Sequence, residues 1–191
     1  MAMRMPPVET RRFTRAEYDR LIARGFFHED EPIELLEGLL VVREPESSRH
    51  AAVVGLVRAA LERAFGPRYH VRDTKPVALD DASEPAPDLA VVPGRFRDYL
   101  DAHPSMPVLL VEVAQSSLAK DRLRKARLYA RAGLTDYWIV NLVDEVLEVY
   151  REPVRWAGRW KYRSVRFLRP GAVVSPLAAP RARIRVADLL P

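Results

Sequence analysis

The sequence predicts a mixed α/β fold in which a single domain has a β-sheet flanked by helices. The chain has 191 residues, 48% of them apolar, which suits one domain with a sizeable core. Its segments follow one another as a helix, a meander of strands that contains one helix, another helix and further strands, an order typical of mixed rather than doubly wound domains. Residues 108–114 are almost wholly apolar, as expected for a central strand covered on both faces.

The amino-terminal part predicts a helix followed by a strand. Thr14 and Glu17 are spaced as a capping box, which predicts a helix that runs through Ala23 and ends at Gly25. Residues 33–43 are predicted as one strand.

A second helix begins near a pair of serines, Ser47 and Ser48, either of which can cap it. Apolar residues and one histidine recur at helical spacing along one of its faces. These residues are His50, Val54, Val57, Leu61 and Phe65. We expect this face to lie against the sheet.

The remaining chain predicts strands and a third helix. The strands are expected at residues 69–71, 76–79, 89–92, 108–114, 137–141, 146–151 and 160–167, the last two as a hairpin. A short helical stretch is expected near residues 95–101. The third helix is expected over residues 118–131, with a stop at Gly133.

Composition limits the possible function classes. The chain has no cysteine, which excludes disulfides and a thiolate zinc site and favours a hard ion such as Mg²⁺ or Mn²⁺. Residues 1–9 lack the apolar core of a signal peptide, and no apolar run approaches the roughly 20 residues that span a membrane. We therefore expect a cytoplasmic protein that does not contact membranes.

Charge is distributed unevenly along the chain. Residues 151–191 hold ten Arg or Lys and only two acidic residues, a net charge of +8, so residues 1–150 carry −3 of the total of +5. A basic segment beside an acidic body suits a phosphate backbone, although an arginine-rich solubilising surface explains it equally well. Only four of the 31 basic residues are lysines, so a lysine retained at a particular position is mildly informative.

Two carboxylates stand at apolar strands. Glu112 is the only charged residue within residues 108–114, and an unpaired carboxylate in a dry strand is too costly unless it meets a cation, a metal or a proton donor. Asp88 stands at the start of another apolar strand, 24 residues earlier. Two carboxylates on adjacent strands supply the oxygen ligands that Mg²⁺ prefers. A structural salt bridge for Glu112 and a turn cap for Asp88 are the alternatives.

Lys125 lies on the apolar face of the third helix. At 100° per residue it shares an arc with Leu118, Asp121, Leu128, Tyr129 and Ala132, whereas Lys120, Arg124, Arg127 and Arg131 share the opposite arc. A lysine on an apolar face needs an anion, and Glu112 on the preceding strand is the nearest candidate in sequence. A snorkelling lysine or an Asp121–Lys125 pair is the alternative.

These segments together resemble the Uma-type family of restriction-endonuclease-like proteins, long catalogued as a domain of unknown function. The resemblance rests on the order and spacing of Pro87-Asp88, Val111-Glu112-Val113, Asp121 with Lys125, and Asp136-Tyr137-Trp138-Ile139-Val140. The earlier segments Ile33-Glu34-Leu35-Leu36-Glu37-Gly38 and Ser47-Ser48-Arg49-His50 resemble the amino-terminal signature of the same family. The similarity runs from about residue 13 to residue 150. It predicts one restriction-endonuclease-like domain over residues 1–191, with a core at about 13–150 and a basic, strand-rich extension at 151–191.

The resemblance implies a PD-(D/E)XK nuclease that hydrolyses phosphodiester bonds of DNA. Asp88 and Glu112, with the Val113 carbonyl, would hold Mg²⁺ or Mn²⁺. Ala114 stands where this motif usually has its lysine, so Lys125 is the substitute that the family uses, and Gln115 can at most assist by hydrogen bonding.

The resemblance also suggests accessory residues. Period-2 alternation puts Glu34 and Glu37 on opposite faces of their strand, and we favour Glu34 for the site because it keeps the family position. Asp121 is expected to position Lys125. His50 is a candidate for orienting phosphate or a carboxylate, with a satisfied core histidine as the alternative.

Two other functions fit the same sequence. One is a protein that binds nucleic acid on this fold without cutting it, and the other is a homo-oligomeric assembly module built from the basic tail and its aromatic hairpin. RNA or branched DNA are alternative substrates, and a homodimer is expected by analogy with enzymes that cut two strands. For the aromatic residues of the hairpin, Tyr150, Trp156, Trp160 and Tyr162, covering of the core or of a subunit interface is favoured over base stacking.

Overall fold

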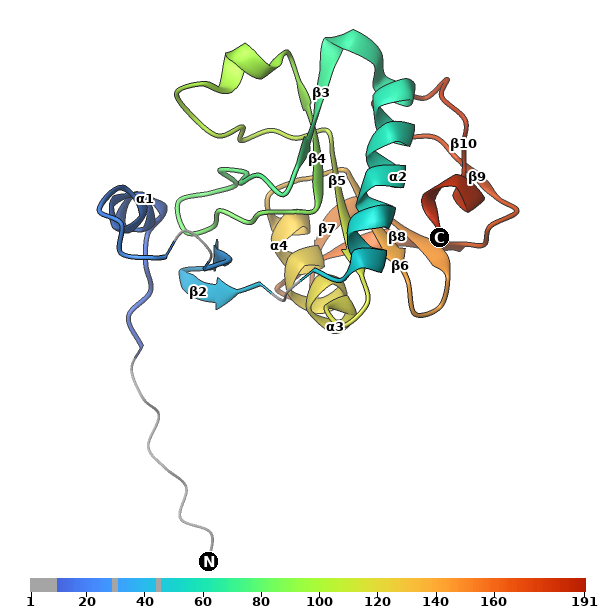
Figure 1. The fold of residues 1–191 in the computed structure, drawn as a ribbon. Coiled ribbons are helices and arrows are strands. Elements are labelled where there is room, and N and C mark those ends of the chain that lie inside the picture. Colours follow the sequence, from blue (N-terminus) through green and yellow to red (C-terminus); the bar gives the residue numbers. More distant parts are fainter. Residues whose placement is uncertain (1–9, 29–30, 44–45) are drawn as a thin grey trace, which may run out of the picture.

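A six-stranded mixed sheet forms the centre of the protein in the computed structural model, which describes residues 10–28, 31–43 and 46–191 (Figure 1). Its strand order is β3-β4-β5-β6-β7-β8. The strands are β3 (Tyr69–Asp73), β4 (Leu89–Pro93), β5 (Leu109–Ala114), β6 (Asp136–Asn141), β7 (Val146–Trp156) and β8 (Arg159–Leu168). β5 and β6 run parallel, and the other neighbouring strands are antiparallel. The predicted fold class, a mixed sheet flanked by helices in one compact domain, is confirmed.

One face of the sheet is covered by α2 (Ser48–Phe65) and by the carboxy-terminal segment (Figure 1). Ser47 caps α2, because its side chain accepts a hydrogen bond from the amide of His50. The carboxy-terminal segment comprises β9 (Val173–Val174), β10 (Ile184–Arg185) and the 3₁₀ turn η4 (Val186–Leu189). Val57 and Leu61 of α2 are fully buried in the core cluster that these elements share with β5 and β6.

A helical segment over residues 118–131 covers the other face, as predicted. It begins as α3 (Leu118–Lys120), continues through the π-helical turn η3 (Asp121–Lys125) and ends as α4 (Ala126–Arg131). Leu128 and Tyr129 are fully buried against the sheet. Tyr150 and Tyr162 belong to the same core cluster, so the interpretation of these two aromatics as core residues is confirmed.

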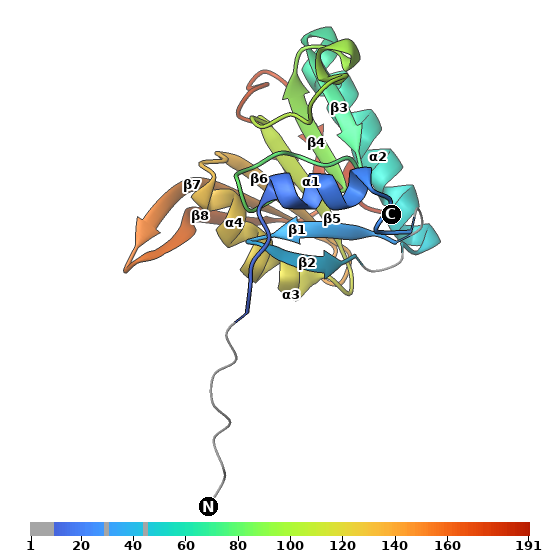
Figure 2. The ribbon, with the colours of Figure 1, turned by 90° about the vertical axis from the view of Figure 1, so that its left-hand side faces the viewer.

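The amino-terminal part of the described chain consists of α1 (Arg15–Ala23) and a small hairpin (Figure 2). Both hydrogen bonds of the Thr14 capping box are present. The prediction of a single strand over residues 33–43 is wrong, because β1 (Ile33–Leu36) and β2 (Leu39–Val42) pair antiparallel. Glu37 and Gly38 have φ angles of 53° and 78°, which form the two-residue turn that reverses the chain.

The strand predicted at residues 76–79 is also wrong. The amides of this segment donate to loop carbonyls, Val77 to Pro85 and Ala78 to Pro104, instead of to a neighbouring strand. An apolar extended segment can thus satisfy its backbone without joining a sheet. The helical stretch expected near residues 95–101 is the 3₁₀ turn η2 (Phe96–Tyr99), and a further turn, η1 (Gly66–Arg68), precedes β3. Within the described ranges, no helix has the length and apolar character needed to cross a membrane.

Candidate active site

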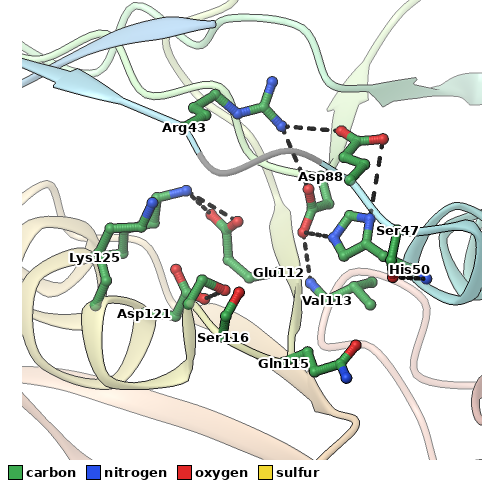
Figure 3. Close-up of a pocket in the computed structure, with 13 residues that line it drawn as sticks. Arg43, Ser47, His50, Asp88, Glu112, Val113, Gln115, Ser116, Asp121 and Lys125 are labelled. Atoms are coloured by element: carbon green, nitrogen blue, oxygen red, sulfur yellow. Dashed lines mark hydrogen bonds and ion pairs between the residues drawn. The ribbon is translucent and has the colours of Figure 1, made fainter.

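A pocket of about 110 Å³ lies between the amino-terminal end of α2, the end of β5 and residues 115–125 (Figure 3). This volume holds several water molecules, since one water needs about 10–15 Å³. Its lining is mostly charged or polar and consists of Arg43, Glu46, Ser47, His50, Asp88, Glu112, Val113, Gln115, Ser116, Ser117, Lys120, Asp121 and Lys125. Six of the seven side chains predicted for the site line it. The seventh, Glu34, forms an ion pair with Lys125.

Strand register brings Asp88 and Glu112 together. In the antiparallel β4–β5 pair Leu89 lies opposite Val111, so continuing this register by one residue sets Asp88 opposite Glu112. Directly opposed residues have Cβ atoms about 4.5–5.5 Å apart. Both residues are almost fully buried, with exposed fractions of 6% for Asp88 and 3% for Glu112.

Asp88 is held as a carboxylate by two hydrogen bonds and one ion pair (Figure 3). Its Oδ2 accepts a hydrogen bond from the Val113 amide at 2.7 Å and lies 3.3 Å from Nε2 of His50. Its Oδ1 lies 3.6 Å from Arg43. Burial raises the pKa of Asp88, but the hydrogen bond and charge of His50, the charge of Lys125 and the Val113 amide together lower it below its ordinary value.

Glu112 is bound by Lys125 and by a tyrosine. The Lys125 ammonium lies 3.0 Å from both carboxylate oxygens, and the Tyr129 hydroxyl donates to Oε1 at 2.7 Å. Burial raises the pKa of Glu112, Lys125 opposes this effect, and three further carboxylates, those of Asp121, Asp88 and Glu34, reinforce it. The net effect raises the pKa of Glu112 to about 8, so its ionised form depends on nearby cations.

Glu34 and Asp121 bring two more buried carboxylates to Lys125. Glu34 Oε2 lies 3.5 Å from the Lys125 ammonium, and Asp121 accepts a hydrogen bond from the Ser117 hydroxyl at 2.6 Å. Within the described part of the chain, Glu34 Oε1 and Asp121 Oδ1 are buried without a hydrogen-bond partner. Burial lowers the pKa of Lys125, but Glu112, Glu34, Asp121 and Asp88 outweigh it, so the pKa is raised and the lysine stays charged. Lys120, Arg43 and His50 also contact carboxylates of this group, and the carboxylate oxygens are ligands that hard divalent cations prefer.

His50, near the start of α2, also contacts Asp88. Burial lowers its pKa, but the hydrogen bond to Asp88, which is the largest effect, raises it. Among the described residues, Glu46, His50 and Asp88 form a group whose possible ligand atoms all lie within 4.8 Å of one another. Asp88 is thus placed to share a cation either with Glu112 or with Glu46 and His50.

The pocket contains residues that sequence reasoning missed. Arg43 at the end of β2 and Glu46 before α2 contact Asp88 and His50, respectively. The spacing of Glu46, four residues before His50, is the signal that could have found it. Tyr129 was placed on the Lys125 arc, four residues after Lys125, but was not recognised as a partner of Glu112.

Lys120 corrects the helical-arc prediction. Helical periodicity predicts Lys120 on the arc opposite Lys125, yet it lines the pocket, and its ammonium lies 3.9 Å from Glu34 Oε1. The cause is the π-helical turn, in which the Ala126 amide bonds to the Asp121 carbonyl five residues back. The extra residue in this turn rotates the preceding residues relative to a regular α-helix.

Of the two glutamates compared in the sequence, Glu34 is the one beside Lys125, but strand alternation is not the reason. Glu34 points inward, whereas Glu37 lies in the hairpin turn and forms ion pairs with Arg127 and Arg131. The two residues are separated by the turn, not by strand alternation. Gln115 lines the pocket, and no hydrogen bond from its side chain to the other site residues is observed among the described contacts.

The fold and the pocket together define a class. A mixed sheet with acidic residues on two adjacent central strands and a buried lysine beside them is the arrangement of restriction-endonuclease-like proteins. A family model, Uma2, described as "Putative restriction endonuclease", matches residues 15–187. The chain therefore belongs to the Uma2 family, and the resemblance recognised in the sequence is confirmed.

A solved structure supports the same fold. It is the crystal structure of "a putative nuclease belonging to DUF820" from Anabaena variabilis ATCC 29413, which has 18% sequence identity and a TM-score of 0.68. The match covers 93% of this chain and 97% of the other. At this identity the similarity establishes the fold. Among curated proteins, none matches this chain.

Proposed function

We propose that this protein is a divalent-metal-dependent endonuclease that hydrolyses phosphodiester bonds of DNA. The observation that carries the proposal is the pairing of Asp88 and Glu112, two buried carboxylates from adjacent antiparallel strands that open onto one pocket, with Lys125 bound to Glu112. Family membership supports the hydrolase class.

The donor set fits Mg²⁺ or Mn²⁺. All its carboxylates are hard oxygen ligands, the chain has no thiolate, and Asp121 Oδ1 is a buried acceptor that lacks a donor among the described residues. Asp88, Glu112 and the Val113 carbonyl would hold the ion. When bound, it would acidify a water molecule and neutralise charge on the phosphate.

The surrounding residues prepare this chemistry. Lys125 is charged and fixed by Glu112, so it can orient the attacking water and stabilise negative charge that develops on the phosphate. Glu34 and Asp121 keep Lys125 in place. His50 helps to hold the Asp88 carboxylate ionised, and both His50 and Arg43 can contact a neighbouring phosphate. Gln115 contributes a neutral hydrogen-bonding group at the pocket rim.

Nicking of supercoiled plasmid with Mg²⁺ or Mn²⁺, compared with EDTA, tests the proposal. We expect metal-dependent nicking by the wild type and its loss in Asp88→Ala, Glu112→Ala and Lys125→Ala. Asp101→Ala, which removes an exposed carboxylate outside the pocket, is the matched control and should cut normally.

Calorimetry with Mn²⁺ separates binding from cleavage. Affinity should fall in Asp88→Ala and Glu112→Ala and persist in Asp101→Ala. A wild type that is inert on duplex, single-stranded and branched substrates, and that binds no Mn²⁺ through Asp88 and Glu112, would contradict the proposal. Cleavage of both strands would further call for a homodimer, which sedimentation velocity measures directly.

A further inference from the structure

The hairpin of β7 and β8 extends beyond the sheet as a free two-stranded ribbon. β6 pairs with β7 only as far as Arg151, opposite Asp136, whereas β7 and β8 remain paired up to Trp156 and Arg159. Residues 152–156 and 159–163 therefore pair with no third strand of the described chain. At about 3.3 Å per residue the ribbon is roughly 16 Å long. Figure 2 shows this hairpin projecting away from the rest of the molecule. We call residues 152–163 the arm.

The arm carries cations that the protein itself does not neutralise. Arg155, Arg159 and Lys161 are exposed, and no carboxylate of the described residues forms an ion pair with them. Arg163 lies 4.0 Å from Glu152, the only acidic residue of the arm. By contrast, Arg151 at the base of the ribbon is bound to the buried Asp136 at 2.8 Å. The charge at the tip is thus available to an external anion.

An aromatic side chain accompanies these cations. Trp156 is 66% exposed beside the turn, and the Lys161 ammonium lies 5.2 Å from the centre of its ring. Most of the indole surface of Trp156 is exposed, whereas tryptophan side chains in folded proteins are highly buried on average. The ring therefore adds a large apolar contact surface to the unpaired cations of the arm.

The arm and the candidate active site lie on two sides of one helical segment. A groove between the arm and this segment is lined by Leu123 and Arg127 on the helical side and by Trp156, Trp160 and Lys161 on the arm. Lys120, Asp121 and Lys125 of the same segment line the active-site pocket. A helix with its side chains is about 10–12 Å across, so a DNA molecule in the pocket can reach the arm within a few phosphates.

We propose that the arm binds duplex DNA beside the site of cleavage, an inference that rests on the proposed function. A two-stranded ribbon has the size that the major groove admits, and its arginines and lysine complement the phosphate backbone. A second copy of the chain fits this surface less well. A symmetric contact through the arm would oppose two sets of unneutralised cations.

Charge reversal in the arm tests this inference. The arm variant is R159E/K161E, and its matched control is R181E/R183E, which makes the same change in net charge at exposed arginines that no described carboxylate pairs. These control residues line a different surface, against α2. Thermal unfolding of both variants checks that each is folded.

Fluorescence anisotropy with a labelled duplex two helical turns long, in EDTA, gives affinity without cleavage. We expect the arm variant to bind roughly tenfold or more weakly, with the slope of log affinity against log salt reduced by about two, and the control to remain near wild type. Trp156→Ala should weaken binding with an unchanged salt slope, because it removes a contact that carries no charge.

Three results would overturn the inference. They are an arm variant that binds like wild type, an equal loss in arm and control variants, and a change from dimer to monomer in the arm variant, which would make the arm an interface between copies. The outcome is separable from that of the nuclease proposal. If DNA binding depends on the arm but no metal-dependent cutting is found, only the nuclease proposal is refuted. If the protein cuts DNA and the arm variant binds like wild type, only the inference about the arm is refuted.

Discussion

Replacing Lys125 with methionine removes the one ammonium that lies within 3.5 Å of both Glu112 and Glu34 among the described residues. Methionine preserves most of the length of the side chain, so the change is mainly one of charge. Both partners of the pair are almost completely buried, and water and salt screen them little. Breaking such a pair typically costs about 3–5 kcal/mol, because it leaves an uncompensated buried charge. We expect a loss of this size in the free energy of unfolding at mildly alkaline pH.

The loss should depend on pH in a direction set by Glu112. Burial already raises its pKa above the ordinary value, and loss of the opposing Lys125 raises it further. A carboxyl whose pKa is higher in the folded than in the unfolded state binds its proton first in the folded state, so stability falls as pH rises between the two values. In Lys125→Met the cost should therefore shrink to about 1–2 kcal/mol near pH 5, where Glu112 is protonated.

Urea unfolding of Lys125→Met, Glu112→Gln and the double variant at both pH values measures this coupling. The double variant should recover part of the stability lost in Lys125→Met, since Glu112 no longer leaves a buried charge unpaired, whereas Glu34 still lacks Lys125. Two results would refute the reasoning, namely an equal loss at both pH values and strict additivity of the single variants. Either would mean that Lys125 is not the counterion of Glu112.

Three further predictions concern neighbouring contacts and the core. Tyr129→Phe removes a buried donor to Glu112 and should destabilise the protein by about 1–3 kcal/mol in urea unfolding, and an unchanged midpoint would contradict the contact. His50→Ala should lower the free energy of unfolding more near pH 6 than near pH 9. The pKa of His50 is raised in the folded state, so its contribution to stability is present below the pKa of the unfolded state and is lost as pH rises through the pKa of the folded state. If thermal unfolding shows the same difference between wild type and variant at every pH in this range, His50 and Asp88 are not coupled. Leu61→Ala, in the fully buried face of α2, should cost about 2–5 kcal/mol in chemical denaturation, whereas Leu56→Ala on the exposed face should cost far less.

The carboxylates and the lysine of the candidate site were predictable from local patterns. Glu112 stood out because a charge in an apolar strand must be compensated, and helical periodicity placed Lys125 on the buried arc. The same periodicity misplaced Lys120, since a π-helical turn leaves no clear mark in the sequence. Glu34 was selected by family position, while the actual turn at Glu37 and Gly38 was overlooked.

By itself, the sequence determined the capping box of the first helix, the central strand β5, the mixed α/β class and the family, and it singled out six of the side chains that line the pocket. These features depend on interactions between residues a few positions apart, for which spacing is sufficient evidence. Only the tertiary structure decided that Arg43 and Glu46 contact the Asp88–His50 pair. It also decided that the backbone amides of residues 76–79 hydrogen-bond to loop carbonyls, and that the β7–β8 hairpin extends beyond the end of β6. Most of these outcomes depend on groups far apart along the chain, and their relative positions are set by how the layers pack, which no local pattern encodes.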